Sequence, residues 1–137
     1  LQVESLRFAT RVTSYGVYEE DARASFRAGD DILVYAEPRG FRTASVPGRP
    51  ADAPQWRVRL RMTLTLFDLV GNREVGRWGP DVVEHLSRSV VRDLHVTRLI
   101  DIPGGTAPGA YELRLELVDV SGAPRDGLAI RRLTIRD

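Results

Sequence analysis

The side chains whose type and spacing most directly suggest binding are three arginines at every second position, Arg57, Arg59 and Arg61. Apolar residues fill the positions between them, so a β-strand would place the three guanidinium groups on one face. Such a stripe could bind an anion or a partner protein, because arginine donates paired hydrogen bonds to carboxylates and phosphates. Alternatively, the stripe is a solvated face whose charges pair across strands with acids such as Glu112 and Glu116.

A second candidate is the segment after an apolar run, where Glu37 is followed by Pro-Arg-Gly-Phe. Pro38 has no N–H to donate, so we expect the strand to leave its sheet here, and Gly40 then permits a sharp turn. Loops that follow strands often carry binding residues. We therefore predict a candidate interaction rim made of Glu37, Arg39 and Phe41. In the alternative interpretation, Phe41 caps the core and Glu37 pairs with a nearby arginine.

The remaining reactive residues form no pattern typical of catalysis or of a metal site. His85 and His95 have no partner at metal-ligand spacing. Asp30 and Asp31 could bind calcium, although turn chemistry alone also selects Asp after Gly29. The chain has no Cys, and it contains neither a G-x-S-x-G elbow nor a phosphate-binding loop. We predict a protein that is not an enzyme, with no catalytic residue, cofactor or metal.

Composition narrows the class of protein. The 137 residues suit one hydrophobic core, and we expect a single domain over residues 1–137. A net charge of +1 argues against nucleic acid as a partner, and no apolar run reaches the roughly 18 residues of a membrane span. The chain begins at Leu1 rather than Met, so we expect a processed fragment. An extracytoplasmic location, periplasmic or at the cell surface, is favoured, and we expect a monomer or a weak dimer.

Alternation of apolar and polar residues, which is typical of strands, runs through most of the chain. It is clearest from Trp56 to Leu66 and from Tyr111 to Leu117. Phe67 breaks the alternation, which predicts a β-bulge or a change of sheet near Leu66. Gly/Pro turns separate seven or eight such segments. This pattern predicts an all-β fold, an antiparallel two-sheet sandwich of the immunoglobulin or fibronectin-III type, with at most one short helix.

Five features of the chain carry further expectations. We expect Gly79-Pro80 to end a strand, and Asp81–Val91 to form either a capped helical turn or an irregular loop. The apolar positions change parity at Arg131-Arg132, which predicts an irregularity in the last strand. Arg98 lies on the apolar parity of its segment, so we expect it to be paired or to extend to a rim. Tyr111 is predicted to be structural, with a buried ring and a hydroxyl bonded to loop backbone.

Two stretches resemble known bacterial sequences. The motifs YGVY, FRAG and YAE, within LRFATRVTSYGVYEEDARASFRAGDDILVYAEPRGF, are similar to the opening of an uncharacterised domain of large bacterial proteins. The stretch IDIPGGTAPGAYELRLELVDVSG resembles the closing hairpin of many bacterial immunoglobulin-like modules. Together they cover about half of the chain, and Gly40 stands where that family would have Asn. The resemblance implies an immunoglobulin-like fold and an accessory or binding role; it implies no activity.

We therefore expect a non-catalytic accessory or protein-interaction module of a larger bacterial protein, which binds another protein or an envelope component. A carbohydrate-binding module is the alternative function. It would need exposed aromatic residues on one sheet face, and Trp56, Trp78 and Phe41 are the candidates, although strand parity does not place them together. A small hydrolase is a third possibility, for which the sequence offers no group of catalytic residues.

Overall fold

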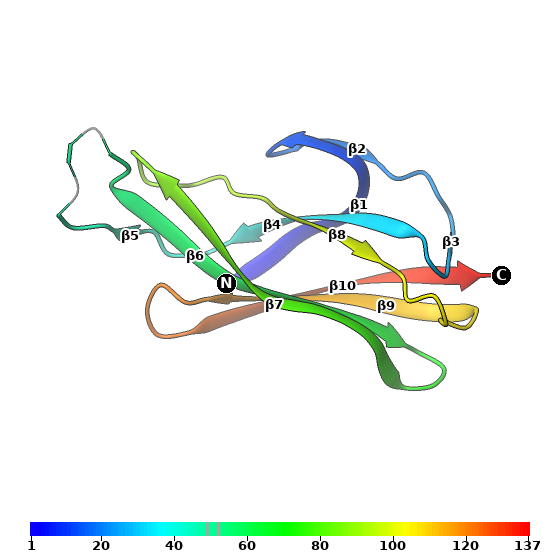
Figure 1. The fold of residues 1–137 in the computed structure, drawn as a ribbon. Coiled ribbons are helices and arrows are strands. Elements are labelled where there is room, and N and C mark those ends of the chain that lie inside the picture. Colours follow the sequence, from blue (N-terminus) through cyan, green and yellow to red (C-terminus); the bar gives the residue numbers. More distant parts are fainter. Residues whose placement is uncertain (49, 52) are drawn as a thin grey trace.

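All regular structure in the described part of the chain is β-strand. The computed structural model describes residues 1–48, 50–51 and 53–137, and Figure 1 shows its fold. These residues form ten strands and no helix, so they include no helix able to cross a membrane. The strands are β1 (Gln2–Ser14), β2 (Val17–Glu20), β3 (Phe26–Arg27), β4 (Asp31–Arg39), β5 (Ala44–Ser45), β6 (Trp56–Asp68), β7 (Arg73–Ser87), β8 (Val96–Asp101), β9 (Gly109–Asp119) and β10 (Arg125–Arg136). The prediction of seven or eight strands was too low, because β3 and β5 are only two residues long and carry no alternation.

The strands form two packed sheets, called sheet A and sheet B. The order in sheet A is β2-β1-β4-β8. The order in sheet B is β3-β10-β9-β6, and both β5 and β7 pair with β6. Every pairing is antiparallel except that of β3 with β10. In Figure 1 sheet A lies above β9 and β10, while the long β6–β7 hairpin twists strongly across the view.

The core lies between the two sheets and is built from alternate residues of the inner strands. Burying one large apolar side chain contributes about 1.5–3 kcal/mol, so a face of alternating apolar residues strongly determines which side of a strand turns inward. The predicted alternation is confirmed in β6 and β9, where every predicted inward residue is buried: Val58, Leu60, Met62, Leu64 and Leu66 in β6, and Tyr111, Leu113, Leu115 and Leu117 in β9.

β7 extends further than the sequence predicted. Gly79-Pro80 does not end the strand. It forms a β-bulge, where the β6–β7 register shifts after Met62. A bulge tolerates proline because its ladder of hydrogen bonds is already interrupted. Asp81–Ser87 then continues as regular strand. The expectation of a helical turn or loop over Asp81–Val91 is therefore wrong as far as Ser87. A second shift follows Leu66 and confirms the irregularity predicted there.

β10 has no irregularity at Arg131-Arg132. It pairs with β9 residue by residue over 125–135, without a register shift. The prediction was wrong because it assumed that every apolar residue of the strand faces the core. Instead Leu128 and Ile130 lie on the outer face of sheet B, with 58% and 50% of their surface exposed.

β4 continues through Pro38 to Arg39, so the expectation that the strand leaves the sheet at this proline is also wrong. Its pairing with β8 stops at Ala36 and Val96, whereas its pairing with β1 continues to Arg39 and Gln2. Pro38 thus lies where β4 has a neighbour on one side only. A missing N–H is tolerated at such an edge, because no ladder hydrogen bond is lost on the open side.

Candidate functional site

The outer face of sheet B, the side turned away from the core, carries the predicted arginine stripe. Arg57, Arg59 and Arg61 occupy alternate positions of β6, between the buried residues. Arg59 and Arg61 are exposed and Arg57 is half-buried. Across the β6–β7 ladder the three arginines lie opposite Leu86, Glu84 and Val82, respectively. Charged and apolar side chains are therefore neighbours on this part of the sheet.

The charges of this face are only partly paired. Arg59 lies 3.8 Å from the carboxylate of Glu84, in a surface pair of the kind that contributes about 0.2–1 kcal/mol. Glu112 pairs with Arg114 of its own strand rather than with the stripe. Among the described residues Arg57 and Arg61 form no ion pair, and the Nε of Arg57 is buried without a hydrogen-bond partner.

Exposed apolar residues flank the stripe on both sides. Val82 and Leu86 of β7 are 56% and 38% exposed, and Leu128 and Ile130 of β10 are 58% and 50% exposed. Single exposed apolar residues are common on soluble proteins, but four of them on one sheet face, separated only by β6 and β9, form a patterned surface. Between them lies a shallow hollow of about 260 Å³, whose lining residues are Thr63, Thr65, Arg77, Arg114, Glu116 and Leu128.

The rim predicted from the sequence is occupied by contacts within the chain. Glu37 accepts a 2.6 Å hydrogen bond from the hydroxyl of Tyr35. Arg39 donates to the hydroxyl of Tyr15 and to the carboxylate of Glu4 at 3.3 Å, and it lies 3.7 Å from Asp93. The geometry therefore matches the alternative interpretation in part, since Glu37 is paired, although its partner is a tyrosine rather than an arginine.

Tyr35 is the centre of this cluster, although it lies on the outer parity of β4. Its side chain is fully buried because the β1–β2 hairpin curls back over sheet A (Figure 1) and stacks Tyr18 on the ring, at 4.4 Å between centroids. His95 stacks on the same ring, at 5.5 Å, and the backbone N–H of Gly16 donates to the Tyr35 hydroxyl at 2.7 Å. Burial and the bond to Glu37 raise the pKa of Tyr35 to about 12.

Phe41, the third predicted rim residue, is half-buried and packs against the core. The segment after it is held by Asp119, a fully buried carboxylate at the end of β9. Asp119 accepts hydrogen bonds from the backbone N–H of Arg42 at 2.7 Å and from that of Ser121 at 2.9 Å. Burial by itself raises the pKa of Asp119, but the hydrogen bonds from Arg42 and Ser121 outweigh it and hold the pKa below its ordinary value.

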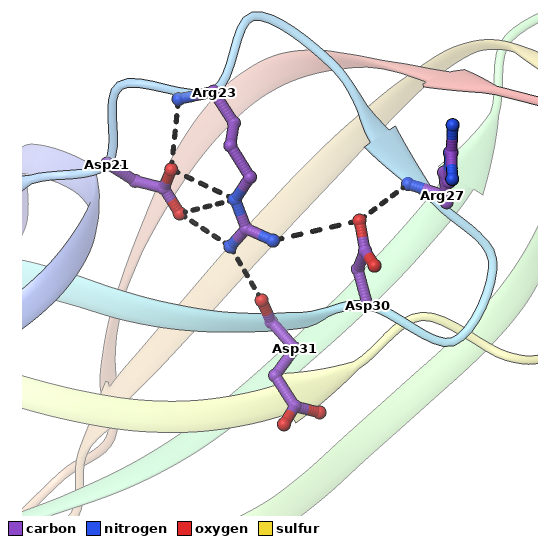
Figure 2. Close-up of polar contacts among 5 residues, drawn as sticks. All are labelled: Asp21, Arg23, Arg27, Asp30 and Asp31. Atoms are coloured by element: carbon purple, nitrogen blue, oxygen red, sulfur yellow. Dashed lines mark hydrogen bonds and ion pairs between the residues drawn. The ribbon is translucent and has the colours of Figure 1, made fainter.

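The turn before β4 is organised by Arg23, as Figure 2 shows. The guanidinium of Arg23 binds both oxygens of Asp21, at 2.6–3.1 Å, and donates to the backbone carbonyl of Asp31 at 2.8 Å. Asp30 accepts from the N–H of Arg27 at 2.8 Å and lies 3.6 Å from Arg23. The side-chain hydrogen bond from Arg23 also lowers the pKa of Asp21.

This arrangement bears on the calcium alternative for Asp30 and Asp31. A guanidinium stands beside Asp30, where a cation would have to bind, and the Asp31 carboxylate points away from the cluster (Figure 2). Within residues 1–48, 50–51 and 53–137, no three or more His, Cys, Asp or Glu side chains are grouped to hold a metal ion. Arg23 therefore supplies the positive charge beside the carboxylates of Asp21 and Asp30.

The aromatic residues considered for carbohydrate binding do not share an exposed face. Trp56 and Trp78 are half-buried, on the inward parity of β6 and β7, and Trp78 packs against the core. Another hollow, of about 290 Å³, lies where the β6–β7 turn meets the β8–β9 loop, and Asp68, Arg73 and Tyr111 are among its lining residues. It offers two carboxylates, those of Asp68 and Glu74, and one guanidinium, but no exposed aromatic ring.

Sequence reasoning missed Arg23 and the group of aromatic residues around Tyr35. The spacing Asp21-x-Arg23 is a signal for a local ion pair, but nothing in the sequence indicates that Tyr18, Tyr35 and His95 stack, because they come from three different strand regions. Comparison of the chain with models of known protein families gave no match, and comparison with curated protein sequences gave none either. The function proposed for this chain therefore rests on the geometry of its surface.

Proposed function

We propose that this chain is an immunoglobulin-like module. Two observations support this assignment. First, β1, β4 and β8 share one sheet, while β6, β7, β9 and β10 share the other; this division corresponds to strands A, B and E against C, C′, F and G of such sandwiches. Second, the Tyr111 hydroxyl donates a 2.6 Å hydrogen bond to the carbonyl of Ala107, near the start of β9, which is the geometry of a tyrosine corner.

The function that the surface supports best is non-catalytic protein binding through the outer face of sheet B. The observation that carries this proposal is the exposure of Leu128 and Ile130 on an uninterrupted β10 ladder. Apolar residues on the solvent face of a regular strand add nothing to the core, and their grouping with Val82 and Leu86 on one face favours a contact outside the chain. The polar hollow and the arginines beside them would supply directional hydrogen bonds at the rim of such a contact.

The role of an accessory domain in a larger bacterial, extracytoplasmic protein belongs to the same proposal and rests on the resemblance of the two sequence stretches. The carbohydrate-binding alternative has less support, because Trp56 and Trp78 lie on the inward parity and Phe41 packs against the core. Sugar recognition by this class of module needs aromatic rings exposed side by side.

A photo-crosslinking experiment tests the proposal. A photoreactive amino acid replaces Ile130 on the outer face of sheet B, or Leu99 on the exposed face of sheet A as the matched control, which is similarly exposed at 60%. Both variants are irradiated in cells of the source organism, and adducts are identified by mass spectrometry. We expect a discrete protein adduct from position 130 and none from position 99. Adducts of equal yield and identity at both positions, or none at position 130, would contradict the assignment of this face.

A further inference from the structure

A free strand edge borders the arginine stripe. β7 is the last strand of sheet B on its side, and within the described residues it forms a ladder only with β6. In Figure 1 β7 runs beside β6 as the second strand of the long twisted hairpin. An edge strand presents unpaired N–H and C=O groups, which another extended chain can pair with.

Most of the features that commonly block a strand edge lie before residues 82–87 of β7, and Glu84 is the one acidic residue within them. Gly79-Pro80 interrupts the ladder, and Asp81 is held by Arg98 of β8, across the open side of the two sheets. Bulges, prolines and inward-pointing charges of this kind protect edges against pairing. The six residues that follow, 82–87, pair with β6 in unbroken register and contain neither proline nor glycine.

The charges beside this edge are complementary to an acidic strand. Arg59 is already paired with Glu84, but Arg57 and Arg61, which flank it, form no ion pair among the described residues. Arg61 lies opposite Val82 and Arg57 lies opposite Leu86. A strand added to β7 would lie about 9–10 Å from β6, two strand spacings away. That distance is within the combined reach of an arginine and a glutamate across a valine or leucine.

We propose that residues 82–87 of β7 bind an extended acidic segment of a partner protein, which adds to sheet B as an antiparallel strand. Its outward side chains opposite Val82 and Leu86 are acidic, four residues apart, and pair with Arg61 and Arg57. Its residue opposite Glu84 is not acidic, because Glu84 would repel it. This inference rests on the proposed function, that sheet B is the interaction surface, and it defines the partner's chemistry and position.

Peptide titration tests the inference with a defined probe. The probe is the acetylated and amidated heptapeptide Thr-Glu-Val-Thr-Val-Glu-Thr, added to isotopically labelled protein and followed by NMR. We expect chemical-shift changes centred on residues 82–87 and slower hydrogen exchange at alternate amides of this segment. Replacing both glutamates of the probe by lysine should weaken binding at least tenfold, as should the double variant Arg57→Gln/Arg61→Gln. Arg132→Gln, at an arginine that is 80% exposed on the same face, is the matched control.

Backbone methylation separates strand addition from simple charge attraction. Two further probes carry N-methyl groups on alternate amides, either on those that would face β7 or on those that would face solvent. Strand addition requires that only the first set abolishes binding. Equal binding of the two probes, equal binding of the lysine and glutamate peptides, or shifts outside this edge would overturn the inference. So would self-association of the protein that the glutamate peptide displaces, because the occupant would then be a second copy of the chain.

The outcomes also separate this inference from the proposed function. If the adduct at position 130 forms and the peptide does not bind, the outer face of sheet B remains the proposed binding surface and the addition of an acidic strand to β7 is rejected. If the peptide binds and no adduct forms at position 130, the β7 edge remains the proposed contact and binding through the outer face of sheet B is rejected.

Discussion

The hydroxyl of Tyr111 donates a 2.6 Å hydrogen bond to the carbonyl oxygen of Ala107, four residues earlier in the chain. The ring is 2% exposed and lies in the core between the sheets. One side chain therefore joins the β8–β9 loop to the start of β9. This confirms the prediction that Tyr111 is structural, with a buried ring and a hydroxyl bonded to loop backbone.

Tyr111→Ala is expected to destabilise the fold by about 3–5 kcal/mol, the usual cost of truncating a buried aromatic side chain. Tyr111→Phe keeps the ring and loses only the hydrogen bond, so it should cost about 1 kcal/mol. Thermal and urea denaturation of both variants measure the two contributions separately. An unchanged melting temperature for Tyr111→Ala would show that the position of this ring is wrong.

Tyr35 should make stability depend on alkaline pH. Its folded-state pKa, about 12, lies above the ordinary value of 10.0, because burial and the bond to Glu37 disfavour the phenolate. A raised pKa means that the stabilisation is present in full below pH 10 and is lost as the pH rises toward 12. Tyr35→Phe cannot ionise, so its unfolding free energy should fall less steeply over this range. Parallel slopes for the two proteins in urea titrations would count against this account.

The same substitution should also loosen the β1–β2 hairpin at neutral pH. Without the Tyr35 hydroxyl, the N–H of Gly16 and the carboxylate of Glu37 lose their partner, and leaving such groups unpaired costs roughly 1–3 kcal/mol. Hydrogen exchange at Gly16 measures this directly, and exchange in β9 serves as the internal control. Protection at Gly16 that is equal to wild type would show that the hydrogen bonds of the Tyr35 hydroxyl do not hold the hairpin in place.

Asp119 should make stability depend on acidic pH. Its pKa is depressed in the folded state, since the hydrogen bonds from Arg42 and Ser121 outweigh the effect of burial. A depressed pKa gives a contribution that is present above about pH 4 and is lost as the pH falls through the folded value. Asp119→Ala removes the acceptor of the backbone N–H groups of Arg42 and Ser121 and should cost about 3 kcal/mol at pH 7. The variant should also lose less stability than wild type between pH 5 and pH 2, measured by denaturant titration.

Phe41 and Glu37 discriminate between the two interpretations of the rim. Phe41 is half-buried against the core, so Phe41→Ala should cost roughly 2 kcal/mol, less than the 3–5 kcal/mol of a fully buried aromatic. Glu37→Gln keeps an acceptor for the Tyr35 hydroxyl and should stay within about 1 kcal/mol of wild type. Chemical denaturation gives both values. A loss below about 0.5 kcal/mol for Phe41→Ala would show that this ring is free for a partner.

The sequence by itself determined which side of most strands faces the core. In β6 and β9 the alternation alone predicts the inward residues, because the side-chain direction of a strand reverses at every residue. The same local rule predicted the irregularity after Leu66, and local turn context predicted the structural role of Tyr111. It also predicted that Arg98 is either paired or extended to a rim, though not that its partner is Asp81.

Only the tertiary structure decided which segments lie side by side. The alternation of apolar and polar residues carries no information about the register between distant strands. It therefore could not show that β10 continues unbroken past Arg131-Arg132, with Ile130 on the outer face of sheet B. It also could not show that a curled hairpin buries Tyr35 on an outer face, or that Asp119 meets Arg42 from 77 positions away. These contacts depend on the free energy of packing the whole chain, in which many long-range pairs form together, and no local window of residues includes both partners.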